Sequence, residues 1–173
     1  MLGTLITSKT RIKLLTKFFV NASNSGYLRG LSKEFNESTN AIRKELNKLT
    51  KAGYLELIND KSQKKLYRAN TQHPLYSAIH NIVLKELGLD SLVASILDRM
   101  GGVSRVIVVG DYAQGVDSGE IEVVIEGDQL NTVYLDKLSS KIENKIGRRI
   151  TFLITSAYHK GGLTMYNAAS ETT

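Results

Sequence analysis

Two carboxylates separated by one residue, Glu120 and Glu122, are the clearest candidates for chemistry in this chain. They follow a turn that contains glycines, Gly110–Gly119, and this turn follows the apolar run Arg105–Val109. A strand, a glycine turn and an acid-x-acid pair on the next strand can hold Mg²⁺ and a nucleotide, because Mg²⁺ binds carboxylate and phosphate oxygens. The pattern predicts either a working metal site or the remnant of one.

This stretch resembles the minimal nucleotidyltransferase fold, in which a strand ends in Gly-Ser, a short helix follows and the next strand carries the acidic pair. Gly110 matches the glycine, and Ala113 and Gly115 match the small residues of the short helix. The run Glu120-Ile121-Glu122-Val123 matches the acid-apolar-acid-apolar pattern. The resemblance implies in-line attack on the α-phosphate of a nucleotide, with paired Mg²⁺ ions held by the carboxylates.

The departures from that family pattern argue against catalysis. Asp111 stands at the serine position, where its charge would repel a triphosphate, and the acidic pair is glutamate instead of aspartate. The interval from Gly110 to Glu120 is short for the family, and Arg149–Thr155 carries no further carboxylate for octahedral Mg²⁺. We therefore expect a domain without catalysis, cofactor or bound metal, in which Asp111, Asp117 and Glu120 are solvated turn residues. The vestigial nucleotide or metal site would consist of Gly110, Asp111, Glu120 and Glu122. An active Mg²⁺-dependent nucleotidyltransferase is the alternative.

Charge divides the chain of 173 residues into two halves. Residues 1–70 contain 14 Lys/Arg and 5 Asp/Glu, a balance of +9, whereas residues 71–173 contain 9 and 12, a balance of −3. This asymmetry indicates that the first half meets a polyanion, or that it has a basic solvated surface. The absence of cysteine excludes disulfides and thiolate metal sites, and the three histidines lack ligand spacing.

A helix over residues 38–53 is the strongest secondary-structure prediction in the basic half. Ser38 can cap it and Gly53 can end it, and Ile42, Leu46 and Leu49 share one side at about 100° per residue. Amide and cationic side chains gather on the opposite side, where they could contact base edges and phosphates in a major groove. Its DNA-facing candidates are Ser38, Thr39, Asn40, Arg43, Lys44, Asn47 and Lys51.

Elements around this helix have the order of a winged helix-turn-helix. Residues 8–21 and the short segment 31–35 have helical spacing, and residues 54–58 and 65–69 are expected to be strands. The polar tip between these strands places Lys61, Lys64 and Lys65 where a wing contacts DNA.

The stretch LSKEFNESTNAIRKELNKLTKAGYLEL resembles the core of ArsR-type and related bacterial winged-helix transcriptional regulators. The resemblance covers about residues 8–70 and is carried by the spacing of apolar residues from Leu31 to Leu49 and by the ending KAGYLE. It implies a homodimer on near-palindromic sites, with these residues facing DNA: Ser38, Thr39, Asn40, Arg43, Lys44 and Asn47. Metal sensing is not implied, because the family's cysteine and histidine clusters are missing.

The second half is expected to fold separately. His73-Pro74 marks a junction, residues 75–100 have helical spacing, and strands are predicted at 103–109, 121–125 and 149–155 around a helix at 134–146. We predict an α+β protein with a winged helix in residues 1–70 and a small mixed-sheet, nucleotidyltransferase-like domain in residues 75–157. Residues 158–173 lack periodicity, which predicts a flexible tail.

These features together predict a cytoplasmic, bacterial-type transcriptional regulator that binds double-stranded DNA as a homodimer. The second domain would serve dimerisation, binding of an unknown small-molecule effector, or both. No membrane partner is expected, because no apolar run approaches the roughly 20 residues that span a bilayer. A winged helix that serves as a protein-interaction module is a further alternative.

Overall fold

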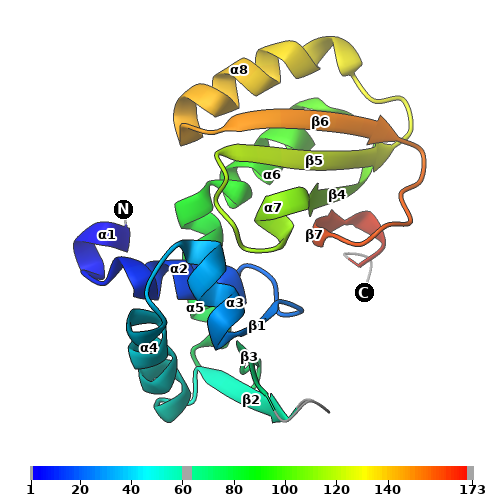
Figure 1. The fold of residues 1–173 in the computed structure, drawn as a ribbon. Helices are drawn as coiled ribbons and strands as arrows, with labels where there is room; N and C mark the ends of the chain where they lie inside the picture. The colour runs from blue at the N-terminus through cyan, green and yellow to red at the C-terminus, as the bar shows by residue number, and fades with distance from the viewer. Residues whose placement is uncertain (1, 60–63, 171–173) are drawn as a thin grey trace. The chain divides into compact units, whose positions relative to one another are not determined.

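The computed structural model describes residues 2–59 and 64–170 and shows an α+β chain (Figure 1). The chain forms two compact units, Met1–Glu86 and Leu87–Thr173. The described residues form two sheets: one of three strands, with bounds β1 (Ser25–Tyr27), β2 (Leu55–Asn59) and β3 (Lys65–Ala69) in the order β1-β3-β2, and one of four strands, with bounds β4 (Val103–Val109), β5 (Glu120–Gly127), β6 (Arg149–Thr155) and β7 (Leu163–Asn167) in the order β6-β5-β4-β7. Within the described ranges, no helix has both the length and the apolar character needed to cross a membrane.

The first unit contains helices on a small antiparallel sheet. Ser8 begins α2 as predicted, since its Oγ accepts a hydrogen bond of 3.2 Å from the backbone N–H of Arg11. The turn after α3 is made by Asn36, which adopts the left-handed conformation at φ 52°. The elements are α1 (Leu2–Leu5), α2 (Lys9–Phe19), β1 (Ser25–Tyr27), α3 (Leu28–Phe35), α4 (Thr39–Lys51), β2 (Leu55–Asn59), β3 (Lys65–Ala69) and α5 (Tyr76–Leu87).

Helix α5 belongs to the first unit, so the boundary lies later than the sequence predicted. The ring of Tyr76 lies 5.6 Å from that of Phe19, and Nδ1 of His80 donates to the carbonyl oxygen of Phe19 at 2.6 Å. Near the other end of α5, Glu86 accepts a hydrogen bond of 3.0 Å from the backbone N–H of Leu2. These contacts join α5 to α1 and α2, and residues 75–86 are therefore not part of the second unit.

The second unit is a mixed sheet with helices. Strands β4 and β6 have the predicted bounds; β5 runs antiparallel to β4 and parallel to β6, with α8 between β5 and β6 in sequence. The elements are α6 (Leu89–Arg99), β4 (Val103–Val109), α7 (Gly110–Ala113), β5 (Glu120–Gly127), η1 (Thr132–Tyr134), α8 (Leu135–Ile146), β6 (Arg149–Thr155), β7 (Leu163–Asn167) and η2 (Ala168–Ser170).

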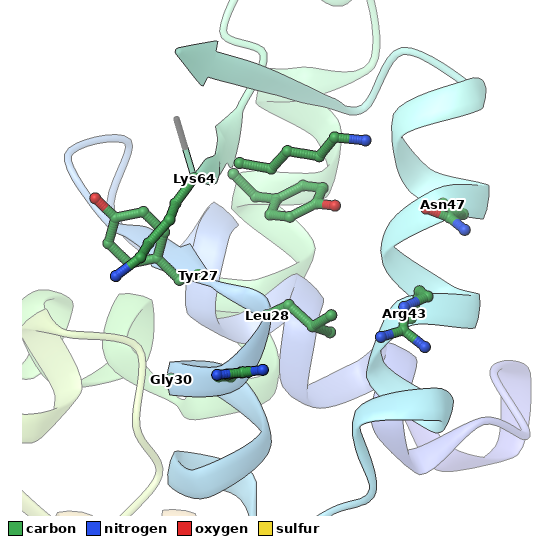
Figure 2. Close-up of a pocket in the computed structure, with 9 residues that line it drawn as sticks. Tyr27, Leu28, Gly30, Arg43, Asn47 and Lys64 are labelled. Carbon is green, nitrogen blue, oxygen red and sulfur yellow. The ribbon is translucent and has the colours of Figure 1, made fainter. Parts of the chain in front are cut away.

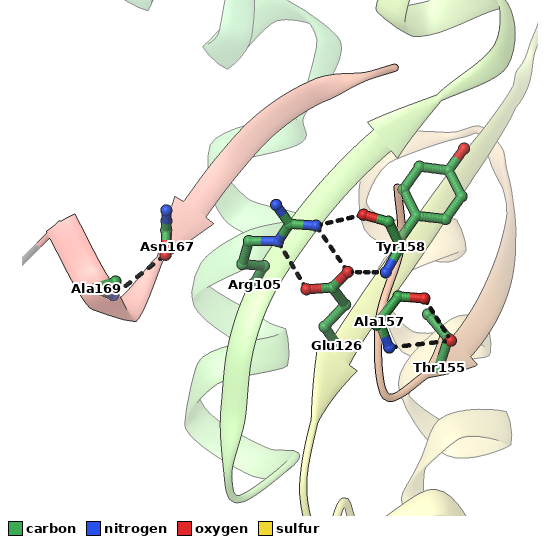
Figure 3. Close-up of polar contacts among 7 residues, drawn as sticks. All are labelled: Arg105, Glu126, Thr155, Ala157, Tyr158, Asn167 and Ala169. Carbon is green, nitrogen blue, oxygen red and sulfur yellow. Dashed lines mark hydrogen bonds and ion pairs between the residues drawn. The ribbon is translucent and has the colours of Figure 1, made fainter. Parts of the chain in front are cut away.

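The prediction of a flexible tail over residues 158–173 is wrong for the part that the structure describes. Strand β7 pairs antiparallel with β4, so its backbone groups have partners in the sheet. The segment before β7 is held by an ion pair, in which Arg105 Nε and Nη2 donate to the carboxylate of Glu126 at 2.7 Å each (Figure 3). Arg105 also donates to the carbonyl oxygen of Tyr158 at 2.7 Å, and the Tyr158 N–H donates to Glu126.

This Arg105–Glu126 pair makes the stability of the second unit depend on pH. Hydrogen bonds from Arg105 lower the pKa of Glu126 below its ordinary value, against the opposing effect of burial. A lowered pKa in the folded state contributes stability that is present above the unfolded pKa and is lost as pH falls through the folded one.

We therefore expect Glu126→Gln to unfold at a lower temperature than the wild type at neutral pH, with the difference shrinking on acidification. Thermal unfolding between about pH 7 and pH 3 measures this. Glu120→Gln, which changes an exposed carboxylate on the same strand, is the control. A constant gap between wild type and Glu126→Gln across this range would contradict the assignment.

Candidate nucleic-acid interface

Helix α4 is defined by a cap at its start and a glycine after its end. Ser38 has extended backbone, and its Oγ accepts a hydrogen bond of 3.2 Å from the N–H of Ala41. Gly53 follows the helix at φ +79°, a conformation that side chains with a Cβ rarely adopt. The predicted helix and its cap are therefore confirmed, and Ser38 has a structural role besides its proposed contact with DNA.

One side of α4 is buried and tied to α2. Ile42, Leu46 and Leu49 lie in the core, and Glu45 beside them is also buried. Arg11 of α2 donates from Nε to Glu45 at 2.7 Å, and Lys48 Nζ lies 3.5 Å from the same carboxylate. Burial would raise the pKa of Glu45, but the hydrogen bond and charge of Arg11 outweigh it and lower the pKa. The apolar stripe and this ion pair together fix the rotation of α4 about its axis.

The opposite side of α4 is open to solvent. Within it, Arg43 Nη1 donates to Asn40 Oδ1 at 2.8 Å, which holds an amide and a guanidinium next to each other. All the candidates of α4 and its cap are exposed: Ser38, Thr39, Asn40, Arg43, Lys44, Asn47 and Lys51.

An open hollow of about 790 Å³ lies between α4, the beginning of α3 and the hairpin β2–β3 (Figure 2). It brings together four residues that the sequence nominated: Arg43, Asn47, Lys64 and Lys65. It also includes residues that the sequence did not nominate: Tyr27, Leu28, Arg29, Gly30 and Tyr67. Lys61, another predicted wing residue, lies outside the described part of the chain. The antiparallel pairing of β1 with β3, which places Tyr27 opposite Leu66, has no local signal in the sequence.

Several cations of the first unit have carboxylate partners, whereas those of this surface have none among the described residues. Lys13, Lys17 and Arg68 pair with Glu37, Glu34 and Glu56 at 2.8, 2.9 and 2.5 Å. In contrast, a set of exposed cations on and around the hollow has no carboxylate partner among the residues that the structure describes. This set is Arg29, Arg43, Lys44, Lys51, Lys64 and Lys65. Their charges are therefore available to an external anion.

The acidic residues of the second unit are arranged differently from a metal centre. Gly110 has φ +64°, and the carboxylate of Glu122 lies where a Cβ at Gly110 would be. Glu120 accepts a hydrogen bond of 2.9 Å from Thr151 Oγ1 and lies opposite Arg149 in the parallel ladder. Asp111, Glu120 and Glu122 are all exposed. Within residues 2–59 and 64–170, no three or more His, Cys, Asp or Glu side chains gather where they could hold a metal ion.

Asp117 lies exposed in a turn, as predicted, but it also has side-chain partners that the sequence did not indicate. Arg148 donates to its carboxylate from Nη2 at 2.6 Å and from Nε at 3.0 Å, and the hydroxyl of buried Tyr112 donates to it as well. Burial would raise the pKa of Asp117, but these hydrogen bonds and the charge of Arg148 lower it. Asp117 therefore anchors the turn between α7 and β5 to the end of α8. Arg148 is far from it in sequence, so no local pattern indicated the pair.

Comparisons with models of known protein families, with curated proteins and with solved structures find no match.

The cap geometry predicts how the start of α4 responds to mutation. Ser38→Ala removes the acceptor for the Ala41 N–H and should lower the free energy of unfolding by about 1 kcal/mol. Ser38→Asn should retain most of the stability, because an amide oxygen can also cap a helix. Chemical denaturation of both variants measures the effect, with Thr39→Ala as a neighbouring control. Equal loss in Ser38→Asn and Ser38→Ala would contradict the capping role.

Proposed function

We propose that residues 1–86 form a winged helix-turn-helix that binds double-stranded DNA and that the protein is a transcriptional regulator. The observation that carries the proposal is the exposed face of α4, with its amides and with cations that have no carboxylate partner among the described residues, beside a hairpin that carries Lys64 and Lys65.

The order of elements agrees with this proposal. Helix α3, a tight turn at Asn36 and helix α4 are followed by the antiparallel strands β2 and β3. In a winged helix-turn-helix, the second helix of the motif enters the major groove and the first supports it. Helix α4 is the element in this position, and its buried stripe packs inward while its polar side is free.

The side chains of α4 are suited to both parts of DNA recognition. Arg43 can donate two hydrogen bonds to guanine, and an asparagine such as Asn40 or Asn47 can form two with adenine. Lys44 and Lys51 can contact phosphates, which position a protein on the duplex without reading its sequence. A solvated helix face would be expected to pair its cations with neighbouring acids or scatter them. The cations of α4 and the hollow instead lie next to one another without a carboxylate partner among the described residues, a lack that exposed Lys9 and Lys33 share outside the hollow.

We propose that the second unit is a nucleotidyltransferase-like domain without catalysis, which serves dimerisation or effector binding. The acidic pair is present on β5, but Glu122 occupies the space at Gly110, and Glu120 is engaged by Thr151. The ArsR-type relationship, the homodimer, the cytoplasmic location and the effector belong to the same proposal.

Arg43 and Lys64 provide a test that separates base reading from phosphate contact. Arg43→Ala should weaken binding to the preferred duplex by about 1–3 kcal/mol and relax the preference at one base position. Lys64→Ala should weaken binding equally on all sequences and reduce the salt dependence, by a slope of about 0.9 in log K against log salt. Selection of bound duplexes from a random pool, followed by titration at several salt concentrations, measures both.

Lys9→Ala removes an exposed cation of α2 that neither belongs to α4 nor lines the hollow, and it should leave both properties unchanged. Unaltered sequence preference in Arg43→Ala would remove the role of α4 in reading bases. The proposal as a whole fails if the wild-type protein shows no salt-sensitive binding to any duplex in the pool.

The alternative function, an active nucleotidyltransferase, is supported by the register of β4 and β5, which places Glu122 beside Val109 just before Gly110. We expect no Mg²⁺-dependent incorporation of labelled nucleotide into DNA, RNA or the protein itself. The assay compares wild type with Glu120→Gln and the double variant Glu120→Gln, Glu122→Gln. Incorporation by the wild type that disappears in these variants would establish the enzyme and overturn our interpretation.

A further inference from the structure

The hollow of the first unit has walls from three elements that are separate in the sequence. Leu28, Arg29 and Gly30 begin α3, Arg43 belongs to α4, and Lys64 lies just before β3. Figure 2 shows Leu28 pointing toward the side of α4 where Arg43 lies. A ligand in this hollow would therefore contact α4 and the hairpin at the same time.

The charges around the hollow indicate a polyanion. Arg29, Arg43, Lys64 and Lys65 line it, and none of the lining residues that the structure describes is acidic. Like charges that share one hollow repel each other, so a bound anion with several charges relieves this repulsion at several points. The lining also includes Leu28 and Tyr67, which offer apolar contact between the charged groups. Alternation of charge and apolar surface matches the phosphates and sugars of a nucleic-acid strand.

Gly30 leaves room for such a strand. It lies within helix α3, where glycine is an unfavourable choice, and it has no positive φ that would require glycine. A Cβ built at residue 30 would meet no heavy atom within 4 Å. Neither the backbone conformation nor the packing of the first unit therefore explains the absence of a side chain. The neighbouring hollow explains the glycine at residue 30, because a longer side chain there would extend into the open space of the hollow.

We propose that this hollow seats the sugar–phosphate backbone of one strand of the bound duplex, with Arg29 as a phosphate contact and Gly30 as the residue that keeps the seat open. This inference rests on the proposed DNA binding and adds α3 to the contact surface. The strand would lie between α4, which reaches the bases, and the hairpin lysines, which approach the same backbone from the other side. Arg29 then contributes affinity without contributing sequence preference.

The test uses the full-length protein and a labelled mixed-sequence DNA duplex. Gly30→Gln adds a neutral side chain with good helix propensity, so the thermal unfolding temperature should not fall, whereas duplex affinity should fall by about tenfold to a hundredfold. Gly30→Ala adds a single carbon and should bind within about twofold of the wild type. Arg29→Ala should lower the salt slope by roughly 0.9 with sequence preference retained.

Gly3→Gln is the matched control, since a Cβ at Gly3 also meets nothing within 4 Å but lies in α1, outside the hollow. In one outcome, the wild type binds duplex while Gly30→Gln and Arg29→Ala bind with unchanged affinity and salt slope. This result would contradict the proposed contact between the hollow and the DNA backbone, but not DNA binding by α4. If the wild type binds no duplex, the proposed function and the seat both fail. A loss in Gly3→Gln equal to that in Gly30→Gln would also overturn the seat.

Discussion

Burial of one apolar stripe decides which side of α4 faces water. Ile42, Leu46 and Leu49 must enter the core, and the buried carboxylate of Glu45 must meet Arg11 of α2. Removing Arg11 would leave the buried carboxylate of Glu45 with only the more distant Lys48 as a cationic partner, which is costly. These constraints leave α4 one orientation, with its amides and cations outward. Both the proposed groove contacts and the hollow beside them depend on that orientation.

In the second unit, two ion pairs hold separate chain segments together. Arg105 and Glu126 hold the segment before β7 to the sheet, and Arg148 holds the turn at Asp117. Glu126 in particular needs its partners, because a buried polar group without a partner costs free energy. The acidic pair on β5 is outside both networks, and the residues around it do not form a metal site within the described chain.

Local signals in the sequence predicted α4 and two strands of the second unit well. These signals are local: the cap at Ser38, the spacing of Ile42 and Leu46, and the β-branched runs at β4 and β6. Because each involves only a few neighbouring residues, it can be read from the sequence. The missed features depend on contacts between distant residues. Strand β7 depends on pairing with β4, and the hollow depends on β1 lying beside β3. Arg29 therefore gave no signal, although its charge and exposure are the same as those of the nominated residues.

Charge reversal on α4 tests the central claim most directly. Lys44 lies on the exposed face, outside the hollow, and has no carboxylate partner among the described residues. Equilibrium binding to a pool of DNA duplexes should be abolished or strongly reduced in Lys44→Glu, whereas Lys9→Glu, with the same change of charge on α2, should bind nearly as the wild type does. Equal binding of the wild type and Lys44→Glu to every duplex in the pool would contradict the account.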